Sequence, residues 1–382
     1  MSNEVLDDVL SDVLSDVAST IDKKPTPVNI VDKKPISKFK SGVGIDIGTS
    51  FIVVTRQLHS GEFVHKFHRN MLYPLDISEE STDMLENGSY PYIKSGDKYY
   101  VVGDAALSIC LAIGKGEVIR PMSAGVLSTS ISNASELIFL IIKSVLGEPL
   151  SSNEPLRVSI PANAIDANID NLFHKIVLNN FFKTLGYDPR PVNEAMCVAY
   201  ITNPKVKTEE GEEIPLSGIA ISMGAGLTNV ALLFRGMELG SFSVSKSGDY
   251  IDEMSSLATG IQKSKTIKKK EKDLNLITPN HSDRALSALS IYYTEYIDRV
   301  VHYIKKEFSE RKSEISGEAE IVIAGGTSMP QGFITLFEQA ISNSNFPFKI
   351  SKIVHATNPF YAVSEGACLK ARSDFEKRNK VT

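Results

Sequence analysis

The stretch Gly44-Ile45-Asp46-Ile47-Gly48-Thr49-Ser50 is an apolar run that ends in a glycine turn, and two later stretches have the same form. They are Ile221-Ser222-Met223-Gly224-Ala225-Gly226-Leu227-Thr228-Asn229 and Ile321-Val322-Ile323-Ala324-Gly325-Gly326-Thr327. A glycine turn lets backbone N–H groups approach a phosphate, because no Cβ stands in the way. One such turn is a weak signal, but three in this order and at this separation predict a two-lobed clamp for ATP.

Each turn is expected to hold a different part of the nucleotide. The carboxylate of Asp46 can organise the hydration shell of Mg²⁺, which keeps most of its waters when it binds a protein. Phosphate donors are expected from Gly48, Thr49 and Ser50 in the first turn and, from the opposite lobe, from Gly224, Ala225, Gly226, Leu227 and Thr228. The third turn, with Gly325, Gly326 and Thr327, would let adenine and ribose lie against bare backbone. Taken singly, each of the three could be a simple tight turn.

Composition limits the classes of function. The chain has 382 residues, enough for a large core and two lobes. Its net charge of −5 argues against a nucleic-acid-binding surface. The longest apolar run, residues 137–142, is too short to span a bilayer. The acidic N-terminus does not resemble a signal or transit peptide, and three cysteines without CxxC spacing indicate reduced thiols in a cytoplasmic protein.

Apolar strands alternate with helices after residue 41, which implies α/β architecture. Strands are expected on both sides of the first two turns, and a long helix at residues 282–308. A strand at residues 157–161 is followed by an expected helix, whose apolar positions are Ile169, Leu172, Ile176 and Phe182.

Residues 1–40 differ from the rest of the chain. Valines and leucines recur every four residues with aspartates between them, which predicts a short amphipathic helix; they are Val5, Leu6, Val9, Leu10, Val13, Leu14 and Val17. The sequence Asp-Lys-Lys-Pro then occurs twice, at residues 22–25 and 32–35, as in a polar linker. Two interpretations stay open: a disordered acidic tail, or a tethered helix that binds a protein partner through residues 4–18.

Together these motifs resemble the actin, heat-shock chaperone and sugar-kinase superfamily, and specifically bacterial actins of the MreB and MamK types. The three turns look like the first phosphate, second phosphate and adenosine motifs of that superfamily. Residues 193–196 and 359–367 look like its two connecting helices. Arg120-Pro121-Met122-Ser123-Ala124-Gly125-Val126 resembles the RPMxxGV stretch of cell-shape actins, and residues 100–106 and 246–252 are similar to magnetosome actins. The resemblance covers roughly residues 41–372.

The resemblance implies an actin-like ATPase fold, with two lobes that are each built on a mixed β-sheet with flanking helices, and the nucleotide in the cleft between them. The tail and linker are expected at residues 1–40, and a C-terminal tail at residues 373–382. Lobe I is expected to comprise residues 41–190 plus 355–372, with a small upper subdomain at about 68–117. Lobe II is expected to comprise residues 191–354, with a small upper subdomain at about 248–318.

The resemblance also implies roles for single residues. Asp46 would organise Mg²⁺ through water, Glu194 would orient the attacking water, and Lys268 would contact the nucleotide. The implied cofactors are ATP and Mg²⁺. Subunits would associate into filaments in the cytoplasm as part of a cytoskeleton, and would position organelles such as magnetosomes.

Ser222 departs from the family pattern, because relatives usually carry a metal-linked aspartate at this position. Asn229 stands where many relatives have Asp, and Leu227 where they have Thr. Loss of a positioned charge costs about 10²-fold or more in rate. ATP binding is therefore expected with slow or impaired hydrolysis, and whether ATP is turned over stays open.

Other functions compete with a filament-forming ATPase. A peptide-binding chaperone would need a further domain after the second connecting helix. A small-molecule kinase would need an aspartate base, for which Asp249 and Asp252 are the candidates, although a turn or a helix cap explains either residue. A non-hydrolysing scaffold that recruits a partner through its N-terminal tail is the main alternative.

Overall fold

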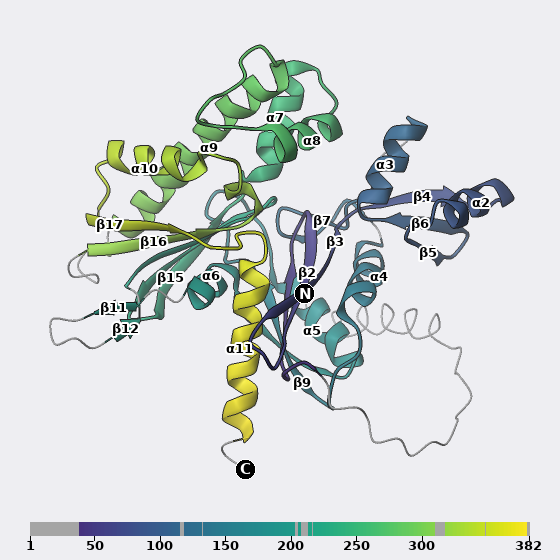
Figure 1. Ribbon diagram of the computed structural model, residues 1–382, viewed down its shortest axis with the longest axis horizontal. Coiled ribbons are helices and arrows are strands. Elements are labelled where there is room, and N and C mark those ends of the chain that lie inside the picture. Colours follow the sequence, from purple (N-terminus) through teal and green to yellow (C-terminus); the bar gives the residue numbers. More distant parts are fainter. Residues whose placement is uncertain are drawn as a thin grey trace.

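Two five-stranded β-sheets form the frame of the computed structural model (Figure 1). It describes residues 38–114, 118–131, 133–202, 205–207, 213–215, 217–309, 318–347 and 349–379. Both sheets mix parallel and antiparallel pairs, which confirms the expected α/β class. The N-terminal helix and linker expected from the sequence lie outside the described residues.

The first sheet has the strand order β10-β9-β1-β2-β3 and forms what we call lobe I. Its strands are β1 (Val43–Ile47), β2 (Phe51–Gln57), β3 (Phe63–Arg69), β9 (Glu154–Ile160) and β10 (Tyr187–Asn193). Two helices, α4 (Ala134–Leu146) and α5 (Leu172–Thr184), share a hydrophobic core with it. The first glycine turn is the hairpin between β1 and β2.

The second sheet has the order β15-β14-β13-β16-β17 and forms lobe II. Its strands are β13 (Gly218–Met223), β14 (Thr228–Phe234), β15 (Met237–Val244), β16 (Glu318–Ala324) and β17 (Lys349–His355). Strand β13 is buried along its whole length, as expected for a central strand covered on both faces. Helices α9 (Arg284–Ser309) and α10 (Phe333–Asn343) pack in the core of this lobe. The second turn joins β13 to β14, and the third follows β16 as the short helix η2 (Gly326–Ser328).

Two helices lie between the sheets and pack against each other: α6 (Glu194–Thr202) and α11 (Ala362–Asn379). Figure 1 shows α11 passing between the lobes. At their contact, a Cβ on Gly366 would lie 2.0 Å from the carbonyl oxygen of Cys197, so only glycine permits this approach. Because α6 starts directly after β10, its first residue, Glu194, is placed at the interface between the lobes.

Smaller elements complete each lobe. Strands β4 (Leu72–Asp76), β5 (Tyr92–Ser95) and β6 (Lys98–Val102) form a three-stranded sheet with α2 (Glu79–Asn87) and α3 (Asp104–Ile113) beside it. Two hairpins are β7 (Met122–Ser123) with β8 (Val126–Leu127), and β11 (Lys205–Lys207) with β12 (Glu213–Pro215). Helices α7 (Gly248–Thr259) and α8 (Lys263–Asp273) pack on α9. Within the described part of the chain, no helix is both long and apolar enough to cross a membrane. The expected subdomain boundaries stay a prediction.

The apolar face expected for α5 was partly wrong. Ile169 precedes the helix, and Leu172 at its first position is 55% exposed. The buried face consists of His174, Val177, Leu178, Phe181 and Phe182. These residues follow helical spacing, but they lie on a face different from the one that Ile169 and Leu172 would define.

A buried ion pair ties the strands of lobe I together, and its removal should destabilise the fold. Glu154 is fully buried and accepts hydrogen bonds from Arg56 (2.8 and 3.1 Å) and from the backbone N–H groups of Gly42 and Leu150 (3.0 and 2.8 Å). Arg56→Met would leave a buried, unpaired charge, so we expect a loss of about 3–5 kcal/mol in the free energy of unfolding by chemical denaturation. The control is Lys98→Met, which removes an exposed ion pair with Asp76 and should cost no more than about 1 kcal/mol. Equal losses for the two variants would contradict the prediction.

Candidate nucleotide-binding site

A cavity of about 430 Å³ lies where the three glycine turns meet between the two sheets. Its wall contains most of the residues expected from the sequence: Asp46, Gly48, Thr49, Ser50, Glu194, Gly224, Ala225, Gly226, Leu227, Gly325, Gly326 and Thr327. Three segments separated by more than 90 residues each therefore share one cavity, of a size typical for small-molecule sites.

The turns of the two lobes are in close contact. A Cβ on Gly226 would lie 2.2 Å from Thr49 Oγ1 and 2.6 Å from the backbone nitrogen of Gly125, so only glycine fits between them. The second and third turns are also joined, because the carbonyl oxygen of Gly224 accepts a hydrogen bond from Thr327 Oγ1 (2.7 Å). At the third turn, the space beside Gly326 is open, with no other atom within 4 Å of its ideal Cβ position.

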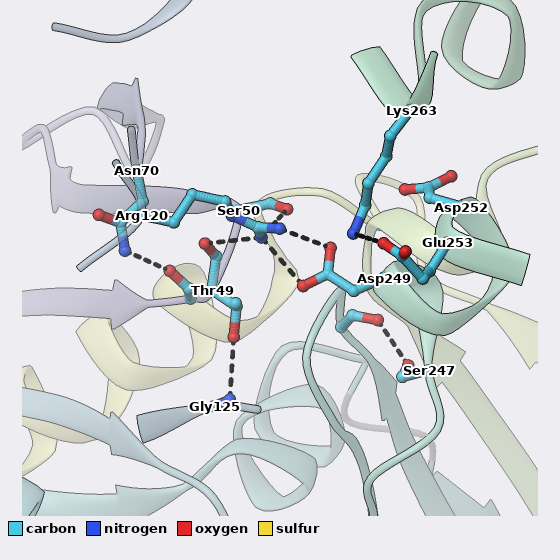
Figure 2. Close-up of polar contacts among 12 residues, drawn as sticks. Thr49, Ser50, Asn70, Arg120, Gly125, Ser247, Asp249, Asp252, Glu253 and Lys263 are labelled. Carbon is cyan, nitrogen blue, oxygen red and sulfur yellow. Dashed lines mark hydrogen bonds and ion pairs between the residues drawn. The ribbon is translucent and has the colours of Figure 1, made fainter. Parts of the chain in front are cut away.

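Hydrogen bonds from outside the turn hold the first glycine turn in shape (Figure 2). Asn70 Nδ2 donates to the carbonyl oxygen of Gly48 (2.9 Å). The backbone N–H of Gly125 donates to Thr49 Oγ1 (2.9 Å). Both bonds use acceptors of the turn and take up none of its donors, while the N–H of Gly48 donates to the carbonyl oxygen of Phe51 (2.9 Å).

Arg120 links the same turn to lobe II. Its Nη2 donates to the carbonyl oxygen of Thr49 (3.0 Å) and to Ser50 Oγ (3.1 Å). Its guanidinium group also forms a two-point ion pair with Asp249 at the start of α7, with both distances 3.0 Å (Figure 2). Burial acts to raise the pKa of Asp249, but the charge and hydrogen bond of Arg120 outweigh it and the pKa is lowered.

Two buried carboxyl groups line the cavity, one near the end of β1 and one at the start of α6. Asp46 accepts a hydrogen bond from Ser159 Oγ (2.7 Å), and burial raises its pKa to about 6. Burial and the charge of Asp46 raise the pKa of Glu194 to about 8, although hydrogen bonds from Asn229 and Ser222 act in the opposite direction. The amide of Asn229 bridges two groups, accepting from the backbone N–H of Ala162 (2.9 Å) and donating to Glu194 Oε2 (2.8 Å).

The chemistry of these groups fits a magnesium–nucleotide complex. The hydrogen-bond partners of Asp46 and Glu194 are neutral side chains. A cation would therefore favour the ionised forms that burial disfavours in both groups, and would offset the charge of Asp46 that also raises the pKa of Glu194. Within the described residues, no cluster of three or more His, Cys, Asp or Glu side chains could hold a metal. Mg²⁺ fits such a site, because it is usually bound by one or two carboxylates together with phosphates and water.

Two of the residues expected from the sequence do not line the cavity. Thr228 is fully buried, and its hydroxyl is hydrogen-bonded to Ser247 (2.9 Å) and Tyr296 (2.6 Å). Lys268 lies on α8, but the residues of that helix in the cavity wall are Lys270, Glu271 and Lys272.

Sequence reasoning did not assign a role to Arg69 or Arg120. Arg69, at the end of β3, lines the cavity and forms ion pairs with Glu271 of α8 (2.9 Å) and with Asp104 (2.7 Å). Arg120 and Asp104 both lie in stretches that the sequence had marked as resembling bacterial actins. The resemblance of those stretches was the sequence feature that could have marked Arg120 and Asp104. It did not indicate which charged residue each of them would pair with.

The aspartates considered as a kinase base have structural partners. Asp249 is paired with Arg120, as described above. Asp252 is buried and accepts a hydrogen bond from Lys270 (2.7 Å), and burial raises its pKa. Neither residue is part of the cavity wall, which favours the structural interpretation of both.

Several solved structures have a similar fold. "MamK double helical filament" has 19% identity and a TM-score of 0.60, covering 86% of this chain and 98% of that chain. The crystal structure of MreB 5 of Spiroplasma citri bound to AMPPNP has 14% identity and a TM-score of 0.58, covering 89% and 98%. The ethanolamine utilization protein EutJ from Carboxydothermus hydrogenoformans has 13% identity and a TM-score of 0.52, covering 94% and 98%. These matches confirm the expected actin-like fold of the MreB and MamK type.

Comparisons of sequence give one match. A family model described as Volactin matches residues 42–371, which includes all three glycine turns and both connecting helices. A search of curated proteins found no significant match.

Proposed function

Since this chain belongs to the Volactin family, we propose that it is an ATP-binding cytoskeletal protein of the cytoplasm that assembles with copies of itself into filaments and hydrolyses ATP slowly. The observation that carries this proposal is the single cavity onto which all three glycine turns open. The actin-like fold supports it, but the role of each residue is inferred from the chemistry of the cavity.

ATP would lie with its base at the third turn and its terminal phosphates between the first and second turns. The open space beside Gly326 gives room for the base and ribose. Gly48, Thr49 and Ser50 from lobe I and Gly224 to Leu227 from lobe II would hold the phosphates with backbone and hydroxyl donors. Mg²⁺, when bound, would supply a positive charge next to Asp46 and Glu194, whose hydrogen-bond partners are all neutral.

Slow hydrolysis is proposed from the residues that surround Glu194. Ser222 lines the cavity and offers a hydroxyl, not a carboxylate, to the metal side of the site. A pKa of about 8 leaves Glu194 mostly protonated at neutral pH in the metal-free protein. A protonated carboxyl group is a weak acceptor for the attacking water, and phosphoryl transfer depends on such positioning.

Self-association is proposed from the fold, whose similar structures include a MamK double helical filament. Head-to-tail contacts between identical subunits give open filaments when the rotation does not close. Positioning of an intracellular cargo, such as magnetosomes, is the finer prediction that the resemblance to MamK adds.

The proposal is tested by high-speed pelleting with ATP, ADP or no nucleotide, with phosphate release measured in the same samples. We expect protein in the pellet with ATP, and phosphate release that lags far behind assembly. If no protein pellets at any nucleotide or salt concentration, the filament proposal is wrong. Rapid phosphate release would contradict the argument from Ser222 and leave nucleotide binding intact.

A second candidate is a nucleotide-binding scaffold that neither polymerises nor hydrolyses ATP. The specific observation in its favour is the same replacement of a metal-linked carboxylate by Ser222. Recruitment of a partner through residues 4–18 belongs to this proposal. It would be supported by ATP binding in calorimetry without pelleting or phosphate release.

A further inference from the structure

The first glycine turn is surrounded by hydrogen-bond donors from residues outside the turn. Asn70 donates to the carbonyl oxygen of Gly48, and the backbone of Gly125 donates to Thr49 Oγ1. Arg120 donates to the carbonyl oxygen of Thr49 and to Ser50 Oγ. Figure 2 shows Arg120 lying along the turn. Four acceptors of a three-residue turn are thus satisfied by residues outside the turn.

This arrangement determines the direction of the Ser50 proton. A guanidinium group has five N–H donors and no acceptor, whereas a hydroxyl group has one donor and two acceptor lone pairs. Ser50 Oγ must therefore accept from Arg120, and its own proton has to point to a different partner. Since Ser50 lines the cavity, that proton is available to an anion bound there. Asp249 keeps the guanidinium group in place by pairing with both of its terminal nitrogens.

Accordingly, we propose that Arg120 is a positioning residue for nucleotide phosphate: it does not line the cavity, but it keeps the donors of the first turn pointing into it. The inference rests on the proposed binding of ATP. Asp249 of lobe II pairs with the side chain that shapes this turn of lobe I.

Nucleotide affinities test this proposal. Arg120→Met keeps an unbranched apolar side chain, shorter than that of arginine, and removes all donors. We expect the affinity for ATP with Mg²⁺ to fall about 10- to 100-fold, the range typical for loss of a supporting hydrogen bond at a bound ion. Affinity for adenosine, which has no phosphate, should change less than about twofold. Arg120→Lys can still donate to one acceptor of the turn and should recover part of the loss.

A charge swap distinguishes two roles of Arg120: positioning the first turn, and simply joining the two lobes through its ion pair with Asp249. In the double variant Arg120→Asp with Asp249→Arg, the ion pair between the lobes is restored, but Thr49 and Ser50 lose their donor. If Arg120 acts by positioning, the swap stays as weak toward ATP as Arg120→Met. The matched control is Lys263→Met, which removes an exposed pair with Glu253 (2.7 Å) close to Asp249 and should leave the ATP affinity unchanged.

The measured affinities of these variants decide whether Arg120 positions the first turn. Full recovery of ATP affinity by the swap, or equal losses for ATP and adenosine, overturns the positioning role. If Arg120→Met does not fold, as judged by its thermal unfolding, then Ser50→Ala and Arg120→Lys decide, because both should weaken ATP and spare adenosine. If the unmodified protein binds no ATP, the proposed function is wrong; if it binds ATP and Arg120→Met binds it equally well, only this inference is wrong.

Discussion

Ser222→Asp is expected to accelerate ATP hydrolysis about 10²-fold, because it restores a positioned charge of a kind whose loss has that cost. Ser222 is 2% exposed, lines the cavity and pairs across the sheet with Asn229, which holds Glu194. A carboxylate at this position would join Asp46 and Glu194 on the side where the metal is expected. The measurement is phosphate release per subunit with saturating ATP and Mg²⁺.

The control for this variant is Ser222→Asn, because asparagine is similar in size to aspartate and carries no charge. We expect Ser222→Asn not to accelerate ATP hydrolysis. Without Mg²⁺, a third buried carboxyl group should raise the pKa values of its neighbours, so Ser222→Asp should unfold at a lower temperature than the unmodified protein unless metal and nucleotide are added. Equal rates for the Asp and Asn variants would show that a missing charge at residue 222 does not limit hydrolysis.

The positions of the three turns could be predicted from the sequence because each depends on local chemistry. An apolar strand that ends in glycine gives a tight turn whichever sheet it joins, and Asp46 at such a strand end has few other roles. Glu194 was identified by resemblance, and its place at the first residue of α6 brings it to the cavity.

Side-chain direction was less predictable. Thr228 and Asn229 are neighbours on β14, and successive side chains of a strand point to opposite faces. Asn229 therefore meets Glu194, whereas Thr228 meets Tyr296. On α8, the residues in the cavity wall are Lys270, Glu271 and Lys272 of the last turn, whereas Lys268 comes before that turn and does not line the cavity. Neither direction can be read from composition or spacing, because packing against the rest of the lobe determines both.

The ion pair between Arg120 and Asp249 shows a second limit of prediction from the sequence. The two residues are 129 positions apart, and each lies in a stretch that had been noted only for its resemblance to other chains. Sequence patterns report periodicity within an element, but they do not report which elements approach each other. Only the approach of the two lobes brings Arg120 and Asp249 into contact.

Glu194→Gln should reduce phosphate release about 10²-fold and abolish its dependence on pH, because it removes the one group expected to orient the attacking water. In the unmodified protein, Glu194 has a pKa of about 8, so about a tenth of it is ionised at pH 7. The rate should therefore rise with pH up to about 8. A nearby cation favours the carboxylate, so bound Mg²⁺ should move this rise to lower pH.

Asn229→Asp provides the directional control for this argument. Asn229 donates to Glu194 Oε2 at 2.8 Å, and an aspartate in its place would set a second carboxylate against it. The pKa of Glu194 should then increase, and the rising part of the rate profile should move to higher pH. A profile that is flat in the unmodified protein, or that shifts to lower pH in Asn229→Asp, would contradict an orienting role for Glu194. The raised pKa of Glu194 also affects stability. A carboxyl group whose pKa is raised by folding destabilises the folded state as pH rises toward the pKa of the folded state. The nucleotide-free Glu194→Gln protein should therefore have a larger free energy of unfolding than the unmodified protein at pH 8.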